Sequence, residues 1–564
     1  MNQPDWIVLI ITLTAIIGYG VYKSRTSRNL DGYFLSNRSM PWWMVMLSIM
    51  GTQASAVTFL AAPGQAYTDG MRFVQYYFGL PLAAIVICIT FVPVFRRLKI
   101  YTAYEFLETR FDGKTRSLTS FLFLLQRGLS TGISIYAPSI ILSTILDWNI
   151  YWTNLFMGGL LIVYTVTGGA RAVANTQKLQ LIVIFTGLFI AGYYMVSNLP
   201  GNMGFSDALE VGGKLGKMNV ITTGFTENGF DWGDRYNIIS GVIGGFFLLL
   251  SYFGTDQSQV GRYLTARTES ESKIGLLMNG VVKIPMQFLI LLLGVLVLAF
   301  YQFHKAPAFF NQKEISRLEN SQYKDSLATI QLKMDGIQQE REQLLSNYGD
   351  KPDAAALDKL AILQKSADSV RVSIKELVKL NGGDNNDTNY IFIRFVVDYL
   401  PVGIVGLLIA IIFLASWGSI AAALNSLASS TVIDFHKRIR KRPEDHEHDY
   451  RISRWYSLGW GLFCICVAMF ASNIGNSLIE AVNILGSLFY GTILGVFLVA
   501  FYMKKIQGTA VFIGALLAEV LVVTMFILNE HEIIRLGFLW LNVVGALGVM
   551  LFSWIVQRIV RRGA

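Results

Sequence analysis

The sequence predicts an all-α protein that crosses a membrane many times. Hydrophobic residues make up 53% of its 564 residues and charged residues only 15%, whereas a soluble chain carries roughly a quarter charged residues. Many apolar runs also reach the roughly 20 residues that a helix needs to span a bilayer. We therefore expect a polytopic helical membrane protein.

Thirteen apolar segments are candidate membrane helices. The first has no basic residue before it and no small-residue cleavage site, so we expect it to stay as a helix. The segments begin near residues 5, 41, 72, 117, 150, 178, 237, 274, 400, 455, 478, 509 and 534.

The basic residues of the loops are distributed unevenly. With the N-terminus outside, the loops assigned to the cytoplasm hold 27 Lys and Arg residues, and the outer loops, apart from the segment 304–399, hold five. This is the positive-inside bias of a cell (inner) membrane protein, with the C-terminus in the cytoplasm. The same bias accounts for the net charge of +9 without a nucleic-acid partner.

The second apolar segment contains the stretch GTQASAVT, residues 51–58. Gly, Ser and Thr are poor formers of a helix interior, and their side chains compete for the backbone. A break here would free carbonyls at membrane depth, which is tolerated only where they line a site. A continuous helix with a Ser/Thr-rich packing face is the alternative.

Two basic residues, Arg127 and Lys283, fall inside predicted spans. A charge at this depth is costly, and it usually faces protein, water or a partner. Each residue lies within about ten residues of the predicted inner end of its helix, so a side chain that reaches the interface is the alternative.

The segment 304–399 differs in kind, because much of it is charged and it carries two apolar repeats with alternating spacings of three and four. Such spacing places each repeat on one helix face, and NYGDKPD between them is typical of a turn. We predict an extracytoplasmic antiparallel helical hairpin, either a structural insertion or a binding module. The repeats are Leu327, Ile330, Met334, Ile337 and Leu344, and Ala356, Leu360, Leu363, Ala367, Val370, Ile374 and Leu377.

The stretch FLASWGSIAAALNSLASSTVIDF, residues 413–435, is dense in small and hydroxyl residues inside a long apolar run. Small residues let helices pack closely in a bilayer. Carbonyls and hydroxyls at this depth can also coordinate a small cation such as Na⁺. Together with residues 51–58, the stretch favours an ion site over close packing alone.

Several motifs resemble those of the sodium:solute symporter family, which includes sodium/glucose cotransporters. The resemblance is to a bacterial-type member and covers the chain except for the inserted hairpin. The motifs occur in the family's order and read QASAVTFLAAPGQAY, FVPVF, IYTAYEFLETRF, TGGARAV, DQSQVGRYL and ALNSLASSTVIDF.

The resemblance implies the LeuT-like fold, an inverted repeat of five plus five helices with a broken helix opening each repeat. Substrate and ion then bind between the repeats near the membrane centre, and the repeats rock to alternate access. The implied regions are an extra helix and cytoplasmic loop (1–40), the first repeat (41–197), an outer loop (198–236), core helices 6 and 7 (237–303), the hairpin insertion (304–399), core helices 8 to 10 (400–502) and two C-terminal helices (503–564).

The resemblance also implies a sodium site between the first and eighth core helices. Carried over by motif, its positions are Gly51 and Ala54 on the first helix and Ala415, Gly418 and Ser419 on the eighth. The family usually has a hydroxyl residue at both of the last two positions. Because a glycine stands at the first of these, one ligand is lost or is supplied by Ser416 or water.

Some family members bind a second sodium through an Asp on the fifth core helix. Here Gln177 stands at that position, with Lys178 beside it. The resemblance therefore implies one Na⁺ per cycle as the coupling ion, and no organic cofactor.

The substrate is expected to be a polyhydroxylated or anionic solute: a sugar, inositol, sialic acid or monocarboxylate. Leucines replace polar contacts of the sugar-transporting branch, whereas SAVT and GISIYAPS are more similar to branches that carry iodide, monocarboxylates, vitamins or sialic acid. An arginine lies about one helical turn from the arginine position of the sialic-acid branch. The substrate positions implied by the resemblance are Thr58, Tyr77, Arg127, Tyr252, Lys283 and Asn483.

The expected function is sodium-coupled import of a small organic solute by alternating access. The spans contain no paired Asp, no zinc-type spacing of His and Glu and no Ser/Lys dyad, which argues against an intramembrane enzyme. A transporter-like sensor that signals through a separate partner is the alternative. The expected partners are the solute, Na⁺ and the lipid bilayer.

Overall fold

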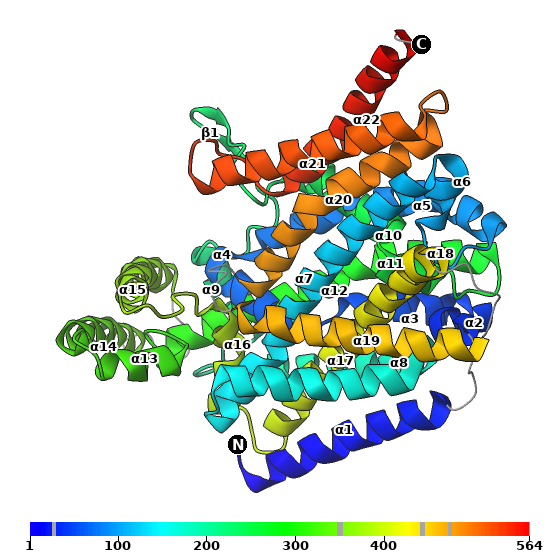
Figure 1. The fold of residues 1–564 in the computed structure, drawn as a ribbon. Coiled ribbons are helices and arrows are strands. Elements are labelled where there is room, and N and C mark those ends of the chain that lie inside the picture. The colour runs from blue at the N-terminus through cyan, green and yellow to red at the C-terminus, as the bar shows by residue number, and fades with distance from the viewer. Residues whose placement is uncertain (25–29, 347–352, 440–445, 472–476, 563–564) are drawn as a thin grey trace.

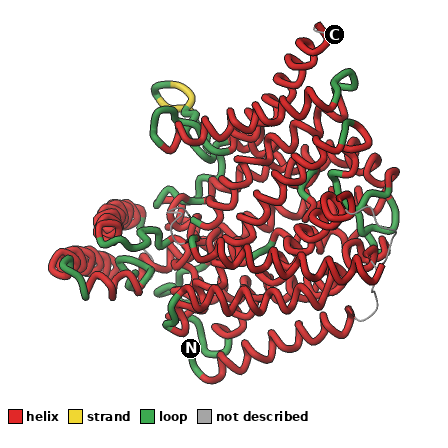
Figure 2. The backbone as a smooth tube through the Cα atoms, in the orientation of Figure 1, coloured by secondary structure: helices red, strands yellow, loops and turns green. Residues whose placement is uncertain are grey.

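The structure is a computed structural model that describes residues 1–24, 30–346, 353–439, 446–471 and 477–562. Within these ranges the chain forms a bundle of helices and one short antiparallel hairpin of strands, as Figures 1 and 2 show. Within these ranges, the side chains of residues 17, 20–24, 30, 31, 167–173, 175, 346, 446 and 562 lie outside the described part.

The first half of the chain supplies the helices that surround the centre of the bundle. Their bounds are α1 (Gln3–Ser24), α2 (Leu30–Leu35), α3 (Trp42–Gln53), α4 (Ala62–Asp69), α5 (Leu80–Leu98), α6 (Glu105–Arg110), α7 (Gly113–Leu146), α8 (Ile150–Ser197), α9 (Phe205–Lys214), α10 (Gly245–Gly254), α11 (Gln257–Tyr263) and α12 (Glu269–Phe303), with β1 (Phe225–Thr226) and β2 (Gly229–Phe230) after α9.

The second half begins with a group of helices that projects from the bundle and ends with two helices on its edge (Figure 1). Their bounds are α13 (Gln312–Glu319), α14 (Lys324–Ser346), α15 (Ala354–Leu380), α16 (Ile391–Tyr399), α17 (Ile404–Ser430), α18 (Lys437–Ile439), α19 (His446–Met469), α20 (Leu478–Tyr502), α21 (Gly508–Glu530) and α22 (Leu539–Arg562). Tighter or wider turns join some of them: η1 (Ser36–Arg38), η2 (Val57–Ala61), η3 (Met71–Gly79), η4 (Ser240–Gly244), η5 (Thr388–Tyr390) and η6 (Thr431–His436).

The prediction of an all-α polytopic membrane protein is confirmed. In the described residues nine helices are long and apolar enough to cross a membrane, and the bent pair that includes α3 and α4 makes up to ten. Three shorter apolar helices, Gln3–Ile16, Ile150–Val166 and Ser240–Gly254, lie where further spans are predicted. The count of thirteen stays a prediction.

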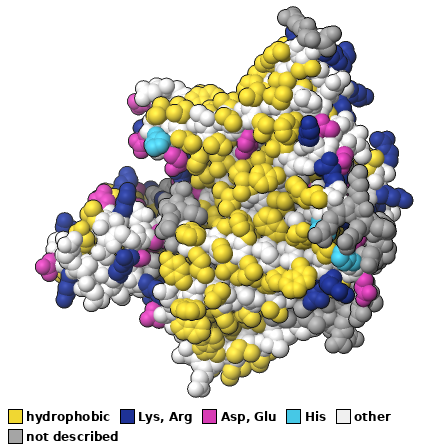
Figure 3. Space-filling model, viewed as in Figure 1, with side chains coloured by type: hydrophobic (Ala, Val, Ile, Leu, Met, Phe, Trp, Pro, Cys, Tyr) yellow, Lys and Arg dark blue, Asp and Glu magenta, His cyan; other side chains and the backbone are white. Residues whose placement is uncertain are grey.

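The surface of the bundle carries a broad apolar band. Figure 3 shows hydrophobic side chains across the middle of the molecule, with Lys, Arg, Asp and Glu gathered toward its two ends. Ile89 on α5 and Tyr193 on α8 are 72% and 75% exposed. Such exposure of large apolar side chains suits contact with lipid, which solvates them as well as a protein core does.

The helix break predicted at residues 51–58 is present. The segments Trp42–Gln53 and Val57–Asp69 meet at an angle of 64°. At the bend the amide of Ser55 donates to the carbonyl of Gln53 (2.9 Å), and that of Thr58 donates to the carbonyl of Ser55 (3.0 Å). In an α-helix these amides would bond four residues back. The carbonyls of Gly51 and Ala54 are thereby left without those partners.

The helix that opens the second predicted repeat is also interrupted. It ends at Gly254, and α11 begins at Gln257 with Asp256 as its N-cap, so this carboxylate lies at the interruption. Both interruptions contribute side chains to the centre of the bundle, which is where the functional site is expected.

Helix α8 runs from Ile150 to Ser197 with continuous helical backbone, although the sequence predicts two spans there. The hydroxyls of Tyr164 and Thr176 lie 2.9 Å apart, whereas twelve residues of straight helix would separate them by about 18 Å. The helix therefore changes direction between these two residues. Its parts before and after the change of direction correspond to the two expected spans.

Helices α14 and α15 pack against each other, as the two apolar repeats predict. Leu327, Leu360 and Ile374 of these repeats are fully buried. The turn predicted between the helices, at 347–352, lies outside the described residues. An ion pair anchors α15: Arg371 donates to Asp387 at 2.7 Å.

Candidate substrate and sodium sites

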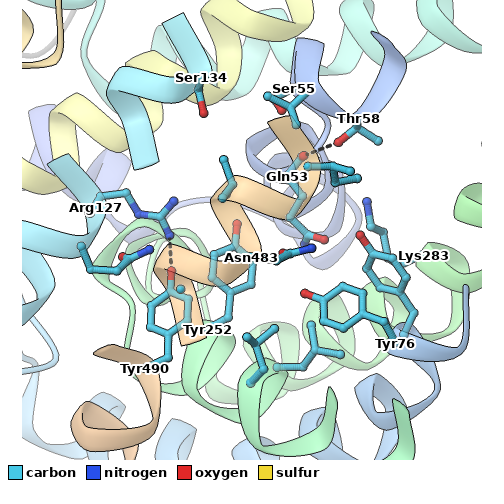
Figure 4. A pocket seen from close by; sticks show the side chains of 18 residues that line it. Gln53, Ser55, Thr58, Tyr76, Arg127, Ser134, Tyr252, Lys283, Asn483 and Tyr490 are labelled. Carbon is cyan, nitrogen blue, oxygen red and sulfur yellow. Dashed lines mark hydrogen bonds between the residues drawn. The ribbon is translucent and has the colours of Figure 1, made fainter. Parts of the chain in front are cut away.

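A cavity of about 110 Å³ with both polar and apolar side chains in its lining lies at the centre of the bundle, between the break after α3 and helices α7, α10, α12 and α20 (Figure 4). All six predicted substrate residues line it. Its lining is Gln53, Ser55, Val57, Thr58, Tyr76, Tyr77, Gln126, Arg127, Ser134, Leu248, Leu249, Tyr252, Lys283, Ile479, Val482, Asn483, Gly486 and Tyr490.

At one end of the cavity Arg127 is already paired with a carboxylate. Its guanidinium forms an ion pair with Asp256 and donates to the hydroxyl of Tyr490 at 2.8 Å. The same hydroxyl donates to Asp256 at 2.6 Å, and the amide of Ser258 donates to the carboxylate's other oxygen at 2.7 Å. The positive charge of Arg127 is therefore neutralised within the protein.

At the opposite end Lys283 has no such partner. Figure 4 places its side chain across the cavity from Arg127. Lys283 is 1% exposed, and in the described part of the chain it forms no ion pair and no hydrogen bond. Its ammonium lies 5.4 Å from the centre of the Tyr77 ring, within the range of a cation–π contact. The cavity thus holds one cation whose charge is not compensated by a carboxylate.

Lys283 belongs to a polar stripe on α12. Asn279 and Gln287 lie one turn to either side of it and are both fully buried. The side-chain amide nitrogen of Asn279 and both amide atoms of Gln287 lack hydrogen-bond partners. No acidic residue interrupts this stripe, so α12 offers only neutral and positive groups here.

The remaining walls combine hydrogen-bonding groups with apolar ones. Asn483 projects from α20 into the middle of the cavity in Figure 4. Thr58 donates to the carbonyl of Gln53 at 3.2 Å, which leaves its oxygen able to accept. Leu248 and Leu249 form an apolar floor. A small solute with one polar end and one apolar side is suited to this lining.

Sequence reasoning missed several lining residues and the partner of Arg127. Gln53, Tyr76 and Tyr490 carry no spacing that distinguishes them from ordinary helix residues. Asp256 could have been suspected, because an acidic residue stands in the motif DQSQVGRYL directly after an apolar run.

A separate vestibule of about 470 Å³ lies beside this cavity and is lined by charged residues of α4, α20 and the segment around the hairpin. Helix α20 lines the vestibule with Ser477 and Glu480 and the central cavity with Asn483, so the two spaces are about one turn apart. Ser477 donates to Gln65 of α4 at 2.9 Å, and Arg235 pairs with Glu480 at 2.8 Å. These bonds join α20 to α4 and to the loop before α10.

The predicted sodium positions surround Gln177. Its amide nitrogen donates to the carbonyl of Gly418 and to the hydroxyl of Thr52, both at 3.3 Å, and its oxygen accepts from Ser48 at 3.1 Å. A Cβ atom at Gly51 would lie 2.8 Å from the same side chain. Gln177 therefore fills the space between the two helices that carry these positions.

The other predicted sodium positions are buried nearby on α3 and α17. Ala54 ends α3, and Ala415 and Ser419 lie in the middle of α17 with little or no exposure. The hydroxyl of Ser419 donates to the carbonyl of Ser416 at 3.1 Å, which leaves its lone pairs available to a cation. The donor set thus consists of neutral oxygens, the kind that Na⁺ meets at unwound helices.

The model of the sodium:solute symporter family matches residues 33–329 and 370–518. The chain belongs to the sodium:solute symporter family. The unmatched stretch, 330–369, includes parts of α14 and α15, as expected for an insertion into the family's core.

Individual family members agree with this result. A sodium/sialic acid symporter of Aliivibrio fischeri is 24% identical over 98% of this chain and 92% of its own length. The human sodium/iodide cotransporter is 30% identical over 49% of this chain and 42% of its own. A sodium/glucose cotransporter of Vibrio parahaemolyticus is 25% identical over 90% and 82%.

A solved structure, described as the substrate-bound outward-open state of a Na⁺-coupled sialic acid symporter, superposes with a TM-score of 0.74. It is 22% identical and covers 99% of this chain and 98% of its own, so the two share a fold. This likeness confirms the predicted fold class, and the match to the family model confirms sodium-coupled symport. The alternative of a membrane sensor finds no support.

Proposed function

We propose that the protein imports a compact anionic solute, a short carboxylate with or without hydroxyl groups, together with one Na⁺ per cycle. The observation that carries this proposal is the uncompensated ammonium of Lys283 in the central cavity. Burying an unpaired charge costs several kcal/mol, and an anion that enters the cavity offsets that cost.

The size of the cavity selects among the anionic solutes. A cavity of about 150 Å³ accommodates benzene in an engineered protein, and the central cavity measures about 110 Å³. A short monocarboxylate is of this size, whereas sialic acid requires the cavity to expand. Thr58, Tyr77, Tyr252 and Asn483 would bind the rest of the solute, and Arg127 would hold the end of the cavity closed through Asp256.

The proposed sodium site uses the carbonyls of Gly51 and Ala54 and the positions Ala415, Gly418 and Ser419. Two features support it: the two carbonyls lack their usual amide partners at the helix break, and Gln177 supplies no negative charge for a second ion. Sodium binding would fix the angle between the two arms of the broken helix and so hold the cavity in shape for the solute.

The direction of transport follows from the proposed orientation, with the N-terminus and the hairpin outside and the C-terminus in the cytoplasm. The solute then enters from the vestibule beside the hairpin when the Ser477–Gln65 bond opens. It leaves on the opposite side, past Arg127 and Asp256.

The direct test is uptake into proteoliposomes under an inward Na⁺ gradient, with short monocarboxylates and their neutral amide analogues as paired substrates. We expect uptake of a carboxylate, no uptake of its amide, and no uptake when K⁺ replaces Na⁺. Equal uptake of the two analogues would overturn the anionic assignment but leave sodium symport intact.

The sodium site has its own test. The substitution Ser419→Ala removes one proposed oxygen ligand, and we expect the Na⁺ concentration for half-maximal uptake to rise roughly tenfold. Ser426→Ala, which removes a hydroxyl that donates to the carbonyl of Ala422 about two turns further along the same helix, is the matched control. An unchanged Na⁺ dependence in Ser419→Ala contradicts the site.

A further inference from the structure

A second, smaller polar cavity lies between α11 and α17, and none of its residues lines the central cavity. Its volume is about 10 Å³, close to the space that a single water molecule needs. The lining consists of Phe34, Gln257, Gly261, Arg262, Asn425, Ser426 and Ser429.

Arg262 is the charged group of this cavity. It is 4% exposed, and within the described ranges no carboxylate pairs with it and no atom accepts a hydrogen bond from its guanidinium. An arginine side chain keeps its proton at neutral pH even when it is buried, so the guanidinium carries its full charge.

Other buried arginines in the structure show that this situation is unusual. Arg116 pairs with Asp434 at 2.6 Å, and Arg371 pairs with Asp387 at 2.7 Å. Arg341 donates to the amide oxygen of Gln364 at 2.8 Å. Among the arginines that are less than one tenth exposed in the described part of the chain, Arg262 alone has neither an anionic nor a neutral acceptor.

Asn425 faces the same cavity from α17 and is also unpartnered. It is 3% exposed, and neither its amide nitrogen nor its amide oxygen has a hydrogen-bond partner. A buried polar group left in this way destabilises the folded state, because it has lost the hydrogen bonds that water gave it. The neighbouring hydroxyls of Ser426 and Ser429 already donate to backbone carbonyls at 2.8 and 3.0 Å. The unused donors are thus those of Arg262 and Asn425.

We propose that this cavity binds a small inorganic anion of the size of chloride, held between the guanidinium of Arg262 and the side-chain amide of Asn425. A water molecule would satisfy some of these donors but would leave the buried charge uncompensated, which destabilises the folded state. The volume excludes a carboxylate solute, which needs several times the space.

The bound anion would connect the two halves of the transport machinery. Helix α11 follows the interruption at Asp256, and α17 carries the proposed sodium positions. Asn425 lies about 9 Å along the helix from Ser419, because six residues separate them. An anion bridging α11 and α17 therefore stabilises the conformation described here. The inference is independent of which solute the central cavity binds.

The first test measures thermal unfolding of the purified full-length protein in potassium gluconate that is replaced stepwise by potassium chloride at constant ionic strength. We expect a saturable rise of the unfolding midpoint with chloride. The rise should be absent in Arg262→Gln, and Asn425→Ala should require a roughly tenfold higher chloride concentration.

Lys283→Gln is the control for the other unpaired cation, and it should keep the full chloride response. A response that is lost in Lys283→Gln but kept in Arg262→Gln would place the anion in the central cavity and overturn the proposal. If the natural protein shows no chloride response, water occupies the small cavity and the proposal is likewise overturned.

A second measurement covers the case that Arg262→Gln does not fold. Crystals of the natural protein grown in sodium bromide should show an anomalous scattering peak beside the guanidinium of Arg262. A map with peaks elsewhere and none at this position contradicts the proposal.

Discussion

The two ends of the central cavity hold the same kind of charge in opposite electrostatic situations. Arg127 is bonded to Asp256 and Tyr490, so its charge stabilises the protein's own structure. Lys283 has only the ring of Tyr77 beside it, so its charge is available to a ligand. A cation inside a membrane protein therefore indicates a binding role only when its partners are known.

The largest effect is expected from a substitution of Arg127, the cation of the cavity that is paired with a carboxylate. In Arg127→Gln the carboxylate of Asp256 stays buried without its cation, and removing one partner of a buried ion pair costs about 3–5 kcal/mol. We expect a correspondingly lower free energy of unfolding, measured by denaturant titration of the purified protein. The double variant Arg127→Gln with Asp256→Asn should recover part of the loss, and a double variant no better than the single one contradicts the pairing.

The next largest effect is expected from a substitution of Lys283, the cation of the cavity without a carboxylate partner. Lys283→Met keeps the length of the side chain and removes the charge. In contrast to Arg127→Gln, it should leave the free energy of unfolding unchanged or raise it. The affinity for the anionic solute should fall roughly a hundredfold. Solute-dependent uptake in proteoliposomes measures this affinity. Lys283→Arg should retain part of it. Unchanged uptake in Lys283→Met would remove the lysine from the site.

A smaller effect is expected at the sodium site, where Gln177 is a neutral group between Gly51 and Gly418. Gln177→Asp introduces a carboxylate beside the freed carbonyls, which favours binding of a further cation. We expect the Hill coefficient of Na⁺-dependent uptake to rise from about one toward two. Gln180→Asp, whose side chain also lies close to Gly418, is the control for a carboxylate placed one turn away. A coefficient clearly above one in the natural protein contradicts single-ion coupling.

The smallest effect on transport concerns a paired cation outside the cavity. Arg371 holds α15 through Asp387 and lies 4.8 Å from the ring of Phe310. If the hairpin is a structural insertion, Arg371→Met should lower the stability of the protein, because Asp387 stays buried without its cation, but it should change uptake per folded molecule by less than about twofold. A loss comparable to that of Lys283→Met would instead assign the hairpin a part in transport.

The sequence allowed the fold and the central cavity to be predicted because both depend on local patterns. The run GTQASAVT contains too many poor helix formers to continue a span, and the break is there. All six substrate positions carried over from the family line one cavity, because motif spacing fixes which helix face each residue occupies.

The pairing of charges could not be predicted in this way. Arg127 and Asp256 are 129 residues apart, and no spacing rule links a residue in the middle of α7 to the N-cap of α11. The contact of Gln177 with the carbonyl of Gly418 joins residues 241 apart. For this reason the two cations of the cavity cannot be distinguished from the sequence alone, and only the packing of distant helices separates them.

The most direct test of the account is the thermal stabilisation of the purified protein by pairs of ligands that differ only in charge, such as a short carboxylate and its amide. Each pair would be measured in Na⁺ and in K⁺, with the natural protein and with Lys283→Met. The account predicts a rise of the unfolding midpoint only for the carboxylate, only in Na⁺ and only with Lys283 present. Equal stabilisation by the carboxylate and the amide, or stabilisation that survives Lys283→Met, would contradict it.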